Sequence, residues 1–146
     1  MHSQLHIEGS GIAILTLDHQ SHPVNVLDTV LLDEVLNHFD HVVSNPSIKG
    51  LIIHSNKDSF IAGVDLSLLG SIDPDHPEIF KTLLLKIHTS MVALEKCPKP
   101  VVCLINGTTL GGGLELALCA NHIIGLEGAT GAIGFPEIKL GIFPGM

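Results

Sequence analysis

Apolar residues recur at intervals of three and four positions in two long stretches, residues 27–43 and residues 80–95. This spacing puts apolar side chains on one face of a helix, so both stretches are predicted to be amphipathic helices. The first helix is predicted to stop at Asn45, because Pro46 cannot continue a helix and disfavours helical backbone in the residue before it. The second is followed by a proline-containing turn at residues 97–100.

Short apolar runs bounded by turn residues predict buried strands. They lie at residues 49–55 and 101–105. Further strands are predicted at residues 122–126 and 132–135, and residues 5–17 are predicted to form two strands around a turn at residues 8–11. A polar, proline-containing loop is expected at residues 71–77. Because helices alternate with these strands, the chain is predicted to be an α/β domain with a mostly parallel sheet.

Three consecutive glycines, residues 111–113, separate the strand at residues 101–105 from a third predicted helix at residues 114–120. A glycine-rich turn before a helix can aim backbone N–H groups at an anion, and glycine lets a ligand approach the main chain closely. A tight packing turn is the simpler alternative. A dinucleotide or nucleotide phosphate loop is disfavoured, because neither G-x-G-x-x-G nor G-x-x-x-x-G-K-[ST] is present. The turn therefore fits a neutral group that becomes negative during a reaction.

Composition narrows the class of protein. The chain has 146 residues, of which 45% are hydrophobic and 15% charged, so one domain with a substantial core is expected and disorder is excluded. A net charge of -8 argues against a nucleic-acid partner. No apolar run reaches the roughly 18 residues of a membrane-spanning helix. Three cysteines inside apolar runs predict buried thiols and a cytoplasmic location.

Two carboxylates have apolar neighbours. Glu115 lies between Leu114 and Leu116, and Glu137 follows Phe135 and Pro136. Either one alone is typical of a solvated position on an amphipathic element, whereas both together, one of them beside a glycine turn, indicate a reactive site.

The helix predicted at residues 27–43 carries two histidines that could bind a metal ion. His38 and His41 are three positions apart on this helix, a spacing that could hold a metal ion. A third ligand is not evident, so a solvated helix face is favoured and no metal site is predicted.

Four stretches of the chain form a recognisable pattern: residues 59–65, 98–107, 110–117 and 134–145. In order and spacing they resemble the enoyl-CoA hydratase/isomerase (crotonase) superfamily, and most closely the hydratase region of multifunctional fatty-acid-oxidation complex α-subunits. The resemblance implies a crotonase-like superhelix of ββα units. Since the chain stops in turn-forming residues after an apolar element, this superhelix is expected to be incomplete at its C-terminus. Residues 1–146 would be the N-terminal core of a hydratase/isomerase domain that lacks its C-terminal helices.

The resemblance also implies a set of site residues. The backbone N–H groups of Val64 and Gly112 would form the oxyanion hole, although Val64 replaces the more usual alanine or glycine. Glu115 and Glu137 would be the catalytic pair of a hydratase. The expected coenzyme A and substrate contacts are Phe60, Ala62, Val64, Asp65, Leu66 and Gly111.

The expected reaction is hydration of 2-enoyl-CoA to 3-hydroxyacyl-CoA in fatty-acid β-oxidation. Glu115, in a first helical turn that favours a charged carboxylate, would deprotonate water, and Glu137, desolvated by Phe135 and Pro136, would protonate Cα. The alternatives are an enoyl-CoA isomerase of the same superfamily and a folded module or assembly fragment without catalysis.

The resemblance carries further expectations about cofactors and partners. Coenzyme A enters as the thioester substrate, no cofactor is expected, and NAD is expected only if a dehydrogenase domain follows. The implied partners are acyl-CoA, further copies of the chain in a homo-oligomer, and a thiolase subunit in the parent complex.

Overall fold

A five-stranded sheet organises the fold in the computed structural model, which describes residues 1–70 and 75–145. Its strands, in spatial order, are β1 (Ser3–Ile7), β2 (Ile12–Leu17), β3 (Gly50–Ser55), β4 (Val101–Ile105) and β6 (His122–Gly125). The β1–β2 pair is antiparallel and the other three pairs are parallel. The prediction of an α/β fold with a mostly parallel sheet is therefore confirmed.

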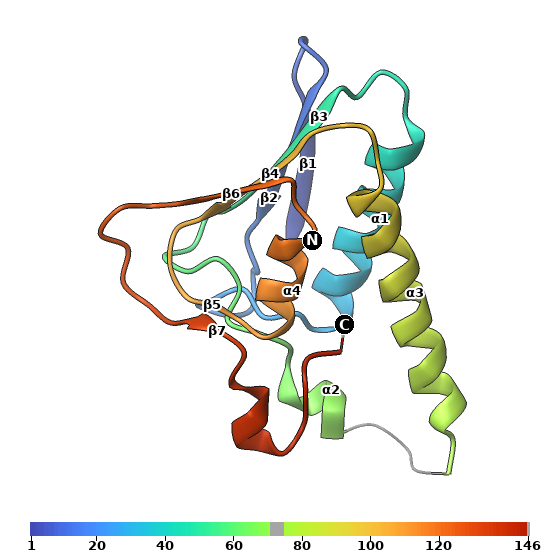
Figure 1. The fold of residues 1–146 in the computed structure, drawn as a ribbon, viewed down its shortest axis with the longest axis vertical. Coiled ribbons are helices and arrows are strands. Elements are labelled where there is room, and N and C mark those ends of the chain that lie inside the picture. The colour runs from blue at the N-terminus through green and yellow to red at the C-terminus, as the bar shows by residue number, and fades with distance from the viewer. Residues whose placement is uncertain (71–74, 146) are drawn as a thin grey trace.

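In the part of the chain that the structure describes, four α-helices and a 3-10 helix accompany the sheet (Figure 1). They are α1 (Thr29–Ser44), α2 (Leu66–Gly70), α3 (Pro77–Glu95), α4 (Gly112–Leu118) and the 3-10 helix η1 (Pro136–Leu140). A second, two-stranded parallel sheet joins β5 (Thr109–Leu110) to β7 (Ile133–Gly134). The helix α3 begins three residues before the predicted start, because proline is well tolerated in a first helical turn. Of the loop predicted at residues 71–77, residues 71–74 lie outside the described residues.

The helix α1 buries residues on two sides. Toward the sheet, Val35 and Phe39 join a core to which β2 contributes the fully buried side chains Leu15 and Leu17. Toward α3, Leu32 and Leu36 pack with Ile87 and Met91 in a second cluster. Figure 1 accordingly shows α1 between the sheet and α3. This two-sided packing explains why the apolar pattern of residues 27–43 is so pronounced.

Both ends of α1 are capped by side chains. At the start, Asp28 Oδ1 accepts a hydrogen bond from the Leu31 N–H at 2.8 Å. At the end, Lys99 Nζ donates to the carbonyl oxygens of Val42 and Val43 in the last turn, and to that of Asn45, the residue after the helix. The caps fix α1, and with it the segment just before α1 that contacts the functional site.

Candidate functional site

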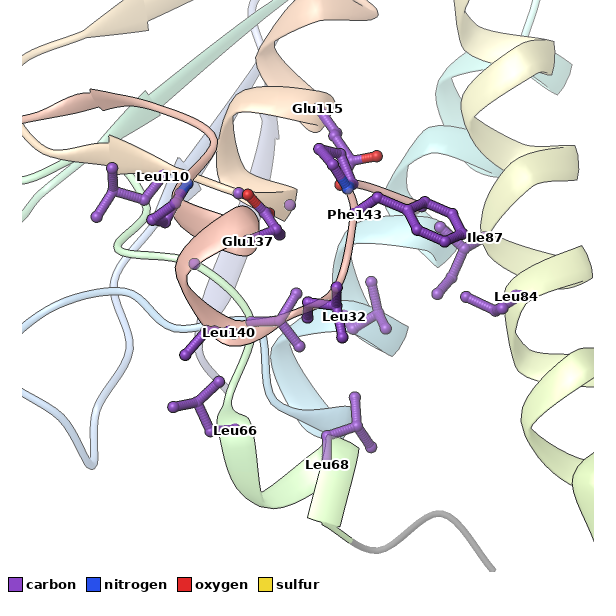
Figure 2. A pocket seen from close by; sticks show the side chains of 18 of the residues that line it. Leu32, Leu66, Leu68, Leu84, Ile87, Leu110, Glu115, Glu137, Leu140 and Phe143 are labelled. Carbon is purple, nitrogen blue, oxygen red and sulfur yellow. The ribbon is translucent and has the colours of Figure 1, made fainter. Parts of the chain in front are cut away.

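A cavity of about 500 Å³ lies between the helices. Apolar side chains from α1, α2, α3, η1 and the chain after η1 form most of its wall: Leu32, Leu66, Leu68, Phe80, Leu83, Leu84, Ile87, Leu140, Ile142 and Phe143. Figure 2 shows Glu115 and Glu137 at this cavity together with seven of these apolar side chains: Leu32, Leu66, Leu68, Leu84, Ile87, Leu140 and Phe143. Among the described residues, these two glutamates are the charged groups of the wall.

The peptide that carries the Val64 N–H has a defined direction. The Gly63 carbonyl, which belongs to the same peptide, accepts a hydrogen bond from the Leu27 N–H at 2.9 Å. Since the carbonyl and N–H of a trans peptide point in opposite directions, the Val64 N–H points away from Leu27. Gly63 has φ +122°, which glycine adopts readily and other residues rarely do. Val64 itself lines the cavity.

The same reasoning places the Gly112 N–H. The Gly111 carbonyl accepts hydrogen bonds from the N–H groups of Leu114 at 2.8 Å and Glu115 at 3.0 Å, so it points along α4. The Gly112 N–H of that peptide therefore points out of the start of α4. Gly112 also lines the cavity, so both residues predicted to supply backbone donors lie on one cavity wall.

The two glutamates reach the cavity from different elements. Glu115 lies in the first turn of α4 and Glu137 lies in η1, and Figure 2 shows both at the cavity. They come together because β5 and β7, which precede these elements, pair in parallel with Leu110 opposite Gly134. Both residues were singled out in the sequence as carboxylates among apolar neighbours, and both line the same cavity.

The two neighbours expected to desolvate Glu137 lie differently. Phe135 is 40% exposed and does not line the cavity, whereas Pro136 does line it. The carboxyl lies instead against Gly111. Its Oε2 atom is buried and has no hydrogen-bond partner among the described residues.

The predicted coenzyme A contacts divide into two groups. Ala62, Leu66 and Gly111 line the cavity, as Val64 does. Phe60 is fully buried in the core, so its side chain cannot contact a ligand. Asp65 lies outside the cavity wall, and its Oδ1 accepts a hydrogen bond from the Ser67 N–H at 2.8 Å, a bond that lowers the pKa of this carboxyl.

Asn25 supports the site and was not predicted to do so. Its fully buried side chain accepts a hydrogen bond from the His19 N–H at 2.8 Å and donates to Ser55 Oγ and the Phe60 carbonyl, both at 2.9 Å. Its own carbonyl accepts the Ala62 N–H at 2.8 Å. Asn25 therefore ties the segment that leads to Val64 to the ends of β2 and β3. In the sequence it is one polar residue in a turn, which carries no such signal.

One group of candidate metal ligands occurs in the described part of the chain: His2, His19 and Asp28, whose ligand atoms lie within 4.8 Å of one another. The two imidazole rings stack with centroids 3.8 Å apart and planes 10° apart. The nitrogen lone pairs lie in these two nearly parallel, separate planes, so they do not converge on one ion. His19 Nε2 instead lies 3.1 Å from Asp28 Oδ2 as a hydrogen-bond partner.

No helix among residues 1–70 and 75–145 has the length and hydropathy needed to cross a membrane.

Comparisons with known proteins agree on one family. The family model described as enoyl-CoA hydratase/isomerase matches residues 8–146. The fatty acid oxidation complex subunit alpha of Shewanella halifaxensis is 41% identical over 137 residues, and that of Shewanella frigidimarina is 39% identical over 136 residues. Each alignment covers 92% of this chain and 19% of the relative, so the chain spans about a fifth of the length of these curated relatives.

Solved structures show the same fold. An enoyl-CoA hydratase from Shewanella pealeana matches with a TM-score of 0.84 and 28% identity, over 99% of this chain and 53% of that one. An enoyl-CoA hydratase from Geobacillus kaustophilus matches with a TM-score of 0.86 and 29% identity, again over 99% and 53%. The predicted crotonase-like architecture is confirmed, and the chain is about half as long as these structures.

Proposed function

Because the chain belongs to the enoyl-CoA hydratase/isomerase family, we propose that its cavity binds a 2-enoyl-CoA thioester and adds water across the double bond. One observation carries the proposal: two carboxylates and two backbone amides line the same, largely apolar cavity. The Val64 N–H points away from Leu27, and the Gly112 N–H points out of the start of α4. The product is a 3-hydroxyacyl-CoA. The apolar side chains from α1, α2 and α3 would contact the acyl chain and exclude water from it.

The two amides would stabilise the developing charge. When water attacks Cβ, negative charge moves through the conjugated system to the thioester oxygen. The N–H groups of Val64 and Gly112 would each donate a hydrogen bond to that oxygen. In a site shielded from water, one such preorganised donor is worth about 3–4 kcal/mol of transition-state stabilisation.

The two glutamates would move the protons. Glu115 takes a proton from water while the water oxygen bonds to Cβ, and Glu137 gives a proton to Cα. The two steps together add one water molecule and leave Glu115 protonated and Glu137 ionised. A proton exchange with solvent then restores the starting state of the pair.

We also propose the setting of this chemistry. Residues 1–146 would be the N-terminal core of a larger hydratase/isomerase domain, supported by the shares of the relatives that the chain covers. Coenzyme A would take part as the thioester, without a resident cofactor, and NAD would be used only by a dehydrogenase domain elsewhere in the parent protein. A homo-oligomer and a thiolase subunit are the proposed partners. Three free cysteines support a cytoplasmic location.

Glutamine substitutions test the proposed roles. In the complete natural polypeptide, Glu115→Gln and Glu137→Gln are each expected to lower kcat for crotonyl-CoA hydration by about 10²–10⁴-fold, because each removes one positioned proton-transfer group. Loss of the enoyl absorbance measures the rate.

Glu127→Gln, at an exposed position in the loop after β6, is the matched control and should leave the rate unchanged. Unchanged hydration in both Glu115→Gln and Glu137→Gln would refute the proposed function. A 3-enoyl-CoA assayed in parallel separates hydration from isomerisation, because the isomerase alternative converts this substrate and adds no water.

A further inference from the structure

Gly111 joins the two elements that carry the glutamates. Its N–H donates to the Gly134 carbonyl of β7 at 3.0 Å, and its own carbonyl accepts the Glu115 N–H of α4 at 3.0 Å. Its backbone angles are φ 51° and ψ -127°, a conformation that residues with a Cβ rarely adopt. The position of Gly111 is therefore determined by main-chain bonds to both β7 and α4.

The space beside Gly111 is filled by Glu137. A Cβ at residue 111 would overlap Glu137 Oε1 and would stand 3.4 Å from the carboxyl carbon and 3.9 Å from Oε2. The three nearest heavy atoms all belong to this one carboxyl group. Gly113 differs, because a Cβ there would meet Ile61, including its carbonyl oxygen at 2.8 Å. The missing side chain at Gly113 thus lets α4 pack against Ile61, whereas the missing side chain at Gly111 leaves room for Glu137, which lines the cavity.

The overlap at residue 111 has a specific consequence. It involves the end of a flexible side chain, so a methyl group there would displace the Glu137 carboxyl by side-chain rotation, in addition to the backbone strain at residue 111. Since Oε2 accepts no hydrogen bond from the described residues, that atom does not anchor the carboxyl against such a displacement.

We propose that Gly111 is a positioning residue for Glu137: the absence of a side chain leaves room for the carboxyl beside the peptide that carries the Gly112 N–H. This inference rests on the proposed function, because it assigns to Gly111 the placement of a proton-transfer group. It adds a role for Gly111 that is distinct from contact with the substrate.

The test is a double-mutant cycle in the complete natural polypeptide. Gly111→Ala is expected to lower kcat for crotonyl-CoA hydration by about 10²-fold or more, close to the loss for Glu137→Gln, with KM changed less than about threefold. In the Glu137→Gln background, where the proton-transfer group is already lost, Gly111→Ala should lower kcat by less than about threefold. Equal losses in the two backgrounds would overturn the inference and leave the proposed function standing. An unchanged rate in Glu137→Gln alone would instead refute the proposed function.

Gly128→Ala is the matched control for backbone strain. Gly128 has φ +76° and no atom within 4 Å of the place where a Cβ would stand. This variant has backbone strain without the overlap, so it should lower the Tm less than Gly111→Ala does and leave kcat unchanged.

Folding of the variants provides the second measurement. In the Glu137→Ala background the overlap is gone, so Gly111→Ala should lower the Tm no more than Gly128→Ala does. A crystal structure of the Gly111→Ala protein should show the Glu137 carboxyl turned away from residue 111. If Gly111→Ala prevents folding in every background, or if the carboxyl keeps its place in the crystal, the inference is wrong.

Discussion

Asn25 is a fully buried polar residue in a core that is mainly aliphatic. Its side chain bonds to the backbone of His19 and Phe60 and to the Ser55 hydroxyl. Each bond fixes a different segment, and the Phe60 bond lies four residues before Val64. A buried amide with partners on three segments specifies one arrangement of them, because other arrangements would leave its polar atoms unpaired.

Replacing Asn25 should therefore affect both stability and the site. Asn25→Ala is expected to lower the free energy of unfolding by about 3 kcal/mol, because it leaves several buried donors and acceptors without partners. Denaturant unfolding measures this change. Asn37→Ala, at an exposed position on α1, is the control and should change the stability little. A loss below 1 kcal/mol for Asn25→Ala would contradict the role assigned to it.

Sequence and structure agree best for residues whose chemistry conflicts with their neighbours. Glu115 and Glu137 were predicted to be site residues because a carboxylate is rarely placed among apolar residues unless it is paired or functional. The apolar wall of the cavity gave no such signal, since Leu32 and Ile87 follow the same helical pattern as core residues do. The packing of Glu137 against Gly111 depends on the β5–β7 pairing, a contact between distant segments that local patterns do not encode.

At the scale of elements, one carboxylate connects β1 to α1. Glu34 Oε2 accepts hydrogen bonds from the His2 N–H at 2.8 Å, the Ser3 N–H at 2.7 Å and the Ser3 hydroxyl at 2.9 Å. Burial raises the pKa of this carboxyl, but the three hydrogen bonds and the N-terminal charge outweigh burial, so the pKa lies below its ordinary value. The ionised form of Glu34 is thus the one that holds the first strand.

The lowered pKa gives this connection a defined pH dependence. The folded protein binds the proton of Glu34 less tightly than the unfolded chain does, so the stabilisation is complete above the unfolded pKa and is lost as pH falls through the folded pKa. Glu34→Gln should lower the free energy of unfolding by about 1–2 kcal/mol at pH 7, and this difference should shrink below about pH 4. Denaturant titrations from pH 7 to pH 3 measure the trend. Glu127→Gln should show no comparable difference, and a Glu34→Gln difference that is constant over this range would contradict the assignment.

The two long helices were the elements that the sequence pattern predicted most clearly. The helix predicted at residues 27–43 is observed at Thr29–Ser44, because two buried faces give it a strong three-to-four periodicity. The short strands β4, β6 and β7 were predicted from apolar runs, whereas α2, β5 and η1, also of five residues or fewer, escaped prediction. Their positions depend on tertiary contacts, such as the bridge between Ile61 and Thr109.

At the scale of the whole molecule, apolar exposure is concentrated in the last part of the described chain. β6 is the last strand of its sheet, and Ile123 and Ile124 on it are 41% and 57% exposed. Leu126, Ile133 and Phe143, further along, are also exposed. An exposed apolar edge strand is a surface on which protein chains associate.

The isolated chain of residues 1–146 should therefore self-associate. Light scattering at rising concentration is expected to give masses above the 15.5 kDa monomer. Ile124→Lys should reduce the association, because it puts a charge on the exposed edge strand. Leu85→Lys on α3, where the side chain is 56% exposed, is the matched control and should have a smaller effect. A monomer at every concentration would contradict the prediction.

The direction of the Val64 amide has a consequence for engineering. The bond between Leu27 and the Gly63 carbonyl orients this amide, and the side chain at position 64 takes no part in it. This bond, and not the side chain at position 64, therefore sets the direction of the donor. The Val64 side chain itself packs against the main core and lines the cavity. Under the proposed function, a different aliphatic side chain at 64 would alter the room for the thioester while the direction of the donor is kept.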